Sequence, residues 1–320
     1  MSTALRPAAK DRTNRENAVD DRPPHICVCV PTYRRPLLLG SCLCGLKAQD
    51  AKGFSYSIVV ADNDVLQSAR NVVDDARRQS SVEIFYCVNS IPNISRARNT
   101  ALKHARGDLI AFIDDDETPH PLWLTGLYAT YVQCAVDGVL GPVAPDYEGT
   151  PPRWLVESRL CERTSLPTGT PLSNVRDMRT GNLLFARAIV LGDEEPFDPR
   201  YGRTGGEDTA FFQKKLEEGR RFVWCEEAIV FETVPRERQT LRYFVRRAVL
   251  LGATAATRER RLGLSTIKSV AAANLYAVAL PFALLLGYHH FVKVLVKDCN
   301  HLGKLLAHLG VKVVRERSST

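Results

Sequence analysis

The stretch DLIAFIDDDETP, residues 108–119, runs from an apolar strand directly into four acidic side chains. Its consecutive apolar residues are typical of a strand covered on both faces of a sheet. The acids that follow, Asp114, Asp115, Asp116 and Glu117, repel one another, and burial would raise their pKa values. A positive partner at the end of this strand would relieve that repulsion, and neighbouring motifs indicate what the partner is.

Similar apolar runs precede this strand: ICVCVP at residues 26–31, YSIVVADND at 56–64 and VEIFYCV at 82–88. Helical patterns separate them at 37–49, 66–79 and 95–107, and a further one follows at 121–134. In the third helix we expect Ser95 as the N-cap and Gly107 as the stop. Alternating strands and helices predict an α/β fold with a Rossmann-like, mostly parallel sheet and flanking helices.

Polar residues end three of these strands. Pro31 and Thr32 end the first strand, Asp62 and Asp64 the second, and the Asp114–Asp116 run the fourth. Because the carboxyl ends of parallel strands share one edge, we expect these residues on a single rim. That rim is where ligands bind in open α/β sheets.

The second half of the chain continues the pattern less regularly. Residues 147–177 are rich in Pro, Arg, Ser and Thr, which predicts an irregular insertion or a long loop over the rim. The segment GGEDTAFFQKKLEEG, residues 205–219, predicts a helix opened by two glycines and two acids. Residues 221–234 predict strands, and residues 238–261 a basic helix.

Composition alone is compatible with several classes of partner. The 320 residues carry a formal net charge of +7, which suits acidic lipid headgroups, nucleotide phosphates or nucleic acid. The 9 Cys include no CxxC pair, so we expect small apolar side chains in a reducing cytoplasm and no zinc site. Residues 1–24 have no apolar signal region and predict a disordered tail.

A divalent cation is one partner that would suit the acidic run. Mg²⁺ and Mn²⁺ prefer oxygen ligands, often one or two carboxylates together with substrate phosphates. Asp114 and Asp116 are two residues apart and project to one side, whereas Asp115 points the other way, toward a sugar or a helix end. The alternative is a solvated acidic turn that caps the next helix.

Two further positions suit a nucleotide. Asp62 at a neighbouring strand end can hold a base or a ribose hydroxyl, or it can form an Asx-turn within its own DND segment. Arg96 and Arg98 lie at a helix N-terminus, where a guanidinium can clamp a phosphate or remain in solvent.

Taken together, these motifs resemble glycosyltransferase family 2, in its bacterial branch of exopolysaccharide and succinoglycan-type glucosyltransferases. The resemblance covers residues 26–252 and rests on the order and spacing of VCVPTYRRP, VVADND, NISRARNTALKHARGDLIAFIDDDE, TGNLLFARA and YGRTGGEDTAFFQKKLEEG. It implies a GT-A fold, a nucleotide-sugar donor, Mn²⁺ or Mg²⁺, and inversion at the anomeric carbon.

The resemblance also implies roles for individual residues. Donor and nucleotide binding falls to Pro31, Thr32, Arg35, Asp62, Asp64, Arg98, Asp114 and Asp115. Asp114 and Asp116 form the DxD motif, with Asp116 as the direct metal ligand. Asp208 matches the general base, with Glu207 beside it in the catalytic GGED segment. Acids in the first turn of a helix also favour its dipole, which is the structural alternative for Asp208.

One position departs from the family pattern. Many relatives carry a late His that reaches the metal, but the corresponding stretch here is VFETVP. Either Glu232 replaces that ligand, or the metal lacks a third protein ligand. Arg246 and Arg247 on the predicted basic helix either reach the diphosphate or face solvent or lipid.

The stretch SVAAANLYAVALPFALLLGYHHF, residues 269–291, carries no formal charge and is long enough to cross a bilayer. Basic residues flank both ends, whereas the positive-inside rule puts such flanks on the cytoplasmic side. We therefore expect a helix bent at Pro281 that re-enters or lies in the membrane interface. The alternative is a buried helix of a soluble protein in the cytoplasm.

These features predict a GT-A catalytic domain at residues 25–262 and a C-terminal hydrophobic and amphipathic helical region at 263–320. The expected reaction is transfer from a nucleotide sugar, with UDP favoured, to a glycan or lipid-linked acceptor at the cytoplasmic face of a bacterial inner membrane. We expect no nucleic acid partner. The alternatives are a nucleotidyltransferase and a non-catalytic carbohydrate-binding protein with this fold.

Overall fold

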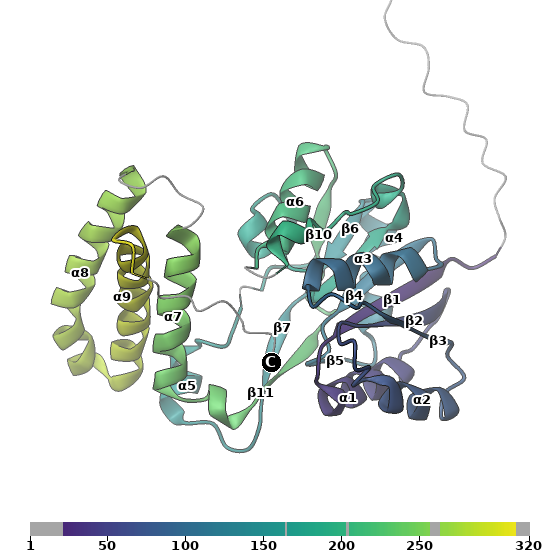
Figure 1. Ribbon diagram of the computed structural model, residues 1–320, viewed down its shortest axis with the longest axis horizontal. Helices are drawn as coiled ribbons and strands as arrows, with labels where there is room; N and C mark the ends of the chain where they lie inside the picture. Colours follow the sequence, from purple (N-terminus) through teal and green to yellow (C-terminus); the bar gives the residue numbers. More distant parts are fainter. Residues whose placement is uncertain (1–21, 164, 203–204, 257–262, 312–320) are drawn as a thin grey trace, which may run out of the picture.

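The computed structural model describes residues 22–163, 165–202, 205–256 and 263–311. Almost all of the expected N-terminal tail therefore lies outside the described residues. An α/β body holds the sheets, and three long helices stand beside it (Figure 1).

The body contains a large central sheet and a small second sheet. The strands of the large sheet are β1 (His25–Thr32), β2 (Ser55–Asp62), β3 (Ile84–Val88), β4 (Leu109–Ile113), β6 (Gly138–Leu140), β8 (Pro171–Leu172), β9 (Asn182–Ala186) and β10 (Phe222–Trp224). Those of the small sheet are β5 (Glu117–Pro119), β7 (Val143–Tyr147) and β11 (Val230–Val234). The helices are α1 (Pro36–Lys47), α2 (Arg70–Arg78), α3 (Ile94–His104), α4 (Trp123–Cys134), α5 (Arg153–Ser158), α6 (Glu207–Glu217), α7 (Leu241–Ala256), α8 (Leu264–Leu286) and α9 (Tyr288–His308).

The central sheet has the strand order β3-β2-β1-β4-β9-β6-β10-β8. The four strands that the sequence predicted are parallel, and Thr32 of β1 lies in register with Asp62 of β2. The expected shared rim is therefore present. Two strands depart from the parallel arrangement: β8 runs antiparallel to β10, and β9 runs antiparallel to both β4 and β6. The TGN turn that precedes β9 therefore returns to the same rim.

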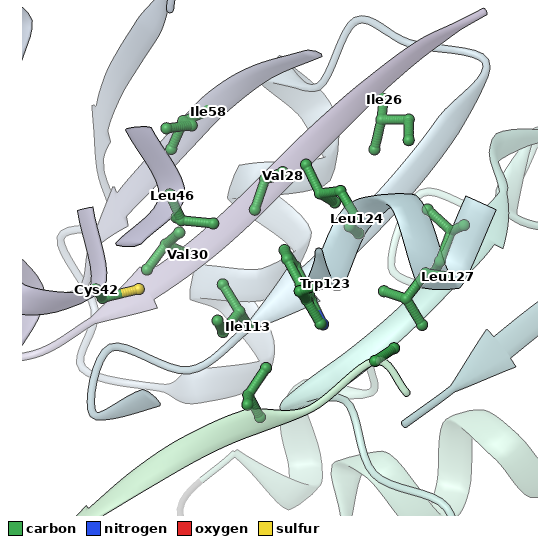
Figure 2. Close-up of a cluster of buried hydrophobic side chains, with 14 of the residues drawn as sticks. Ile26, Val28, Val30, Cys42, Leu46, Ile58, Ile113, Trp123, Leu124 and Leu127 are labelled. Carbon is green, nitrogen blue, oxygen red and sulfur yellow. The ribbon is translucent and has the colours of Figure 1, made fainter. Parts of the chain in front are cut away.

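Alternating residues of β1 pack on opposite faces of the sheet. Ile26, Val28 and Val30 face α1, α2 and α4 in one apolar cluster (Figure 2). Cys27 and Cys29 face the other side, where they join Phe112, Phe185 and residues of α3 and α6. All nine cysteines lie in described residues and are free; six are buried, as expected of small apolar side chains, whereas Cys134 and Cys161 are partly buried and Cys44 is exposed.

The expected N-cap of α3 is wrong. The cap is Asn93, which has an extended backbone and whose side chain accepts a hydrogen bond from the Arg96 backbone amide at 3.0 Å. Ser95 is already inside the helix, and its buried hydroxyl has no hydrogen-bond partner among the described residues. A capping side chain must come from outside the first turn, so the earlier polar residue takes the role.

The segment 147–177 is mainly irregular, as expected, with the short helix α5 and strand β8 as its regular parts. It leads from the small sheet back to the central one. In the small sheet β11 pairs antiparallel with β5 and parallel with β7, so Glu232 lies opposite Glu117.

Helices α7, α8 and α9 pack side by side, away from the central sheet (Figure 1). A Cβ on Gly252 of α7 would lie 1.9 Å from the Asn300 carbonyl oxygen, and one on Gly303 of α9 would lie 2.1 Å from that of Val249. The two backbones therefore touch where these glycines meet. The helix α8 continues through Pro281, where we expect a bend, and the turn to α9 falls at Gly287, with φ +135°.

Candidate functional site

The site lies at the rim where β1, β2 and β4 end. The Thr32 hydroxyl donates a 2.7 Å hydrogen bond to Asp115, which links the first strand to the acidic turn after the fourth. Arg35, in the loop after β1, donates to Asp115 at 3.2 Å and to Asp116 at 3.0 Å. Burial raises the pKa of Asp115 to about 6, against the opposing effects of Arg35 and Thr32.

Glu117, the fourth acid of the run, points beneath the rim. It is 2% exposed and accepts a 3.1 Å hydrogen bond from the Asp114 backbone amide. Burial and the nearby Asp114 raise the pKa of Glu117 well above its usual value. A Cβ on Gly181 would lie 2.7 Å from Glu117 Oε1 and 3.0 Å from Asp114 Oδ2, so the glycine leaves room for both acids.

Arg98 joins the acidic turn to the helix α6. Its Nη1 atom donates to Glu207 at 2.6 Å and to Asp208 at 2.9 Å, and its Nη2 atom donates to Asp114 at 3.3 Å. Burial opposes the charge on this guanidinium, but Asp208, Asp114 and Glu207 outweigh burial and raise its pKa. With a 4% exposed side chain, Arg98 lies among carboxylates rather than open to a diphosphate.

Asp208 is held from two sides. Its Oδ1 atom accepts from Arg98 and, at 2.8 Å, from the Thr180 hydroxyl, while Oδ2 has a longer 3.4 Å contact with the Thr180 amide. Gly206 precedes α6 with φ +99°, a backbone conformation that glycine adopts without strain. Glu207 is 8% exposed, and its Oε2 atom has no hydrogen-bond partner in the part of the chain that the structure describes.

Two acidic residues that we expected to contact the nucleotide, Asp62 and Asp64, are buried at the end of β2. Asp62 is fully buried: its carboxylate accepts from the backbone amides of Asp64 at 3.0 Å and Ala69 at 2.9 Å, and from the Tyr86 hydroxyl at 2.8 Å. The bond to Asp64 is the Asx-turn that the sequence left open. Asp64 is 2% exposed and lies 3.4 Å from the Arg34 guanidinium. These acids shape the loop after β2, and Pro31 is buried within β1 beside it.

Glu232 is the residue that the resemblance suggests in place of the family's late His. It forms an ion pair with Arg163 and lies 3.9 Å from Arg238, which in turn lies 3.8 Å from Asp116. The negative charge of Glu232 is therefore compensated by these two arginines. Arg246 and Arg247 are exposed on α7, and Arg247 donates to the Tyr243 hydroxyl.

Sequence reasoning missed Thr180, Gly181 and Arg163. The first two belong to the TGN segment, where a glycine before an apolar strand was the available signal. Nothing local marks Arg163, because its partner Glu232 is distant in sequence.

The chain resembles known proteins in sequence over most of its length. Residues 27–190 match the family model described as Glycosyl transferase family 2. The chain is 37% identical over 233 residues to the succinoglycan biosynthesis protein ExoM of Rhizobium meliloti (strain 1021), covering 72% of this chain and 74% of that one. It is 26% identical over 185 residues to glycosyltransferase AglE of Haloferax volcanii, covering 58% and 59% respectively.

Two solved structures share the architecture. Mannosyltransferase PcManGT from Pyrobaculum calidifontis, in complex with GDP-Man and Mn²⁺, has a TM-score of 0.57 at 18% identity and covers 89% of this chain and 88% of that one. Residues 1–349 of TarS from S. aureus have a TM-score of 0.50 at 16% identity, with coverage of 89% and 92%. This likeness establishes the GT-A fold. Since the family model spans more than half of the chain and ExoM is related over most of it, the protein is a glycosyltransferase that belongs to glycosyltransferase family 2.

Proposed function

We propose that this glycosyltransferase inverts the anomeric carbon, depends on a divalent metal, and moves a sugar from a nucleotide sugar to a glycan or lipid-linked acceptor of polysaccharide biosynthesis. The observation that carries the proposal is the Arg98 guanidinium, which lies 3.3 Å from Asp114 and 2.9 Å from Asp208. Arg98 thus holds Asp114, which is suited to bind a metal, close to Asp208, which is suited to act as the general base. The name of ExoM supports the polysaccharide acceptor.

A divalent ion suits this rim on the chemistry of its donors. Asp114 and Asp116 offer carboxylate oxygens, and the Gly181 backbone packs closely beside Asp114. Across the described residues, no three or more His, Cys, Asp or Glu side chains converge in a metal-binding group. Two carboxylates completed by donor phosphates and water fit that finding. We therefore assign Mn²⁺ or Mg²⁺ to Asp114 and Asp116; when bound, the ion would neutralise charge on the leaving diphosphate.

The donor lies on the Arg35 side in this proposal. Thr32, Arg35 and Asp115 form the wall that faces the diphosphate, and Pro31, Asp62 and Asp64 set the shape of the nucleotide pocket. UDP is the nucleotide that the family resemblance favours. Arg98 is a positioning residue, because its guanidinium is occupied by three carboxylates.

Asp208 takes the proton from the acceptor hydroxyl. Arg98 and Thr180 hold Oδ1, which leaves Oδ2 as the proton-accepting atom. An acceptor hydroxyl activated there attacks on the face opposite the leaving group, and this gives inversion. Glu207 supports Arg98 from beneath.

The enzyme works at the cytoplasmic face of the inner membrane in this proposal. Among the described helices, the segment Ser265–Leu286 of α8 is long and apolar enough to cross a membrane, and 11% of its apolar window is buried. Leu275, Val278, Phe282 and Leu285 are all more than half exposed, and their spacing puts them on one face. That face suits a membrane interface, where a lipid-linked acceptor would be found.

A nucleotide-sugar panel tests the function. UDP-, GDP- and dTDP-sugars are incubated with the enzyme and Mn²⁺, Mg²⁺ or EDTA, and released nucleoside diphosphate is measured. We expect one donor class to be hydrolysed slowly, only with a divalent ion. Release of pyrophosphate from a nucleoside triphosphate would instead indicate a nucleotidyltransferase, and undiminished turnover in EDTA would overturn the metal assignment.

A further inference from the structure

A cavity of about 250 Å³ adjoins the candidate site on its Asp208 side. Arg179 lines it and is followed by Thr180, which holds Asp208. Arg163 lines it as well and pairs with Glu232, opposite Glu117 in the small sheet. The cavity therefore lies where the substrate that delivers its hydroxyl to Asp208 would sit.

The lining of this cavity has a surplus of positive charge. Of its acids, Glu162 pairs with Arg159 outside the lining, and Asp177 accepts a hydrogen bond from Asn174. The guanidiniums of Arg176 and Arg179 form no hydrogen bond or ion pair within the described residues, and both side chains are exposed. Partial desolvation lowers the pKa of Arg179, and the charges of Arg163 and Arg247 lower it further, against the opposing charges of Asp208 and Glu232.

One lining residue of this cavity also has an unpaired hydrogen-bond donor. Trp224 lines the cavity and is 4% exposed, and its Nε1 atom has no partner among the described residues. Buried polar groups are ordinarily paired. A second cavity, of about 370 Å³, lies behind α6, but its Lys214 and Lys215 already pair with Asp193 and Glu218. The cavity beside Asp208 thus combines two unpaired guanidiniums with one tryptophan, and guanidiniums suit the carboxylate or phosphate of an acidic ligand.

We infer that this cavity is the acceptor subsite and that Arg176 and Arg179 bind an oxyanion carried by the acceptor. This rests on the proposed function and deepens it, because it assigns a chemical class to the acceptor. The oxyanion has two sources: the carboxylate of an acidic sugar or the phosphate of the lipid carrier.

Binding of three small probes tests the inference in the full-length protein. Glucuronic acid, glucose 1-phosphate and neutral methyl glucoside are titrated by calorimetry at fixed ionic strength. Mn²⁺ and saturating UDP, or the nucleoside diphosphate that the panel selects, fill the donor site. We expect one of the two anions to bind at least tenfold more tightly than methyl glucoside. Tighter glucuronic acid indicates an acidic sugar, and tighter glucose 1-phosphate indicates the lipid phosphate.

The double substitution Arg176→Gln and Arg179→Gln should reduce the affinity of that anion tenfold or more, to the level of methyl glucoside, while nucleotide affinity stays unchanged. Arg78→Gln on α2, at an exposed arginine far from the cavity, is the matched control and should change neither. Equal binding of charged and neutral sugars, or an unchanged anion affinity in the double variant, overturns the inference. Failure of the wild-type protein to bind any nucleotide instead overturns the proposed function.

Discussion

At the residue scale, the site depends on one buried guanidinium that holds three carboxylates. Removing one partner of a buried charge cluster leaves the others uncompensated. Arg98→Met should therefore lower the free energy of unfolding by about 3–5 kcal/mol, measured by urea denaturation. Arg96→Met, on the same helix but without an ion pair among the described residues, should cost much less. Equal losses in the two variants would show that the three contacts of Arg98 contribute little.

Asp208 gives a second residue-scale prediction. Asp208→Asn retains an oxygen for Arg98 and Thr180 but removes the base, so kcat should fall by about 10²–10⁴-fold. The affinity for the nucleotide should stay close to that of wild type. Asp193→Asn, which affects a surface ion pair with Lys214, is the control and should leave kcat intact. Normal turnover of the Asp208 variant would favour the non-catalytic carbohydrate-binding alternative.

At the element scale, the close contact of α7 and α9 depends on glycine. Gly252→Ala should force the helices apart, because its Cβ would lie 1.9 Å from the Asn300 carbonyl oxygen. We expect a loss of about 1–3 kcal/mol in the free energy of unfolding. Gly126→Ala in α4 meets Ala228 at an ordinary 3.5 Å and should be neutral or slightly stabilising. Thermal unfolding of both variants checks the contrast, and an undisturbed Gly252 variant would mean that the helices do not pack this closely.

The exposed face of α8 gives a second element-scale prediction. Wild type should sediment with phosphatidylglycerol vesicles, and the triple variant Leu275→Gln, Val278→Gln, Phe282→Gln should not. These side chains are 68%, 65% and 63% exposed, so the stability in solution should change little. Val132→Gln with Leu191→Gln, two exposed apolar positions outside α8, is the control. Wild type that stays in the supernatant would favour the soluble alternative.

Helices and strands could be predicted from the sequence most reliably where a clear apolar pattern runs along the segment. The four parallel strands and α6 follow from local pattern, because a strand buried on both faces must be continuously apolar. The reversal of β9 and the position of the turn after α8 do not follow from it. The strand direction depends on how β9 pairs with β4 and β6, and α8 runs through Pro281 to a turn at Gly287.

At the scale of the whole molecule, the rim unites acids from β4 and α6 with cations from the β1 loop and α3. In the proposed function, Asp114 and Asp116 hold the ion without a larger His, Cys, Asp or Glu group among the described residues, so the ion and the donor should bind together. We expect Mn²⁺ and UDP together to raise Tm by more than the sum of their separate effects. EDTA should remove the excess, and Asp116→Ala should abolish it. A Tm that rises equally with UDP in EDTA would argue against a shared metal.

The sequence alone determined the α/β class, the rim and the residue types gathered there. Those follow from local chemistry: apolar runs make buried strands, and acids at their ends need a positive partner. Local chemistry could not decide between Ser95 and Asn93 as the N-cap of α3, because both residue types are good caps. The backbone conformation in the folded chain makes Asn93 the cap.

Only the tertiary structure decided how the charges pair. Arg98 looks like a phosphate ligand in the sequence, yet three carboxylates from two other elements surround it. Arg176 and Arg179 look like ordinary surface arginines, yet the end of the irregular segment and the residues after it bring them to a cavity beside Asp208. Coulomb energy depends on distance in space and on burial, and neither quantity is encoded in the local sequence around a charge.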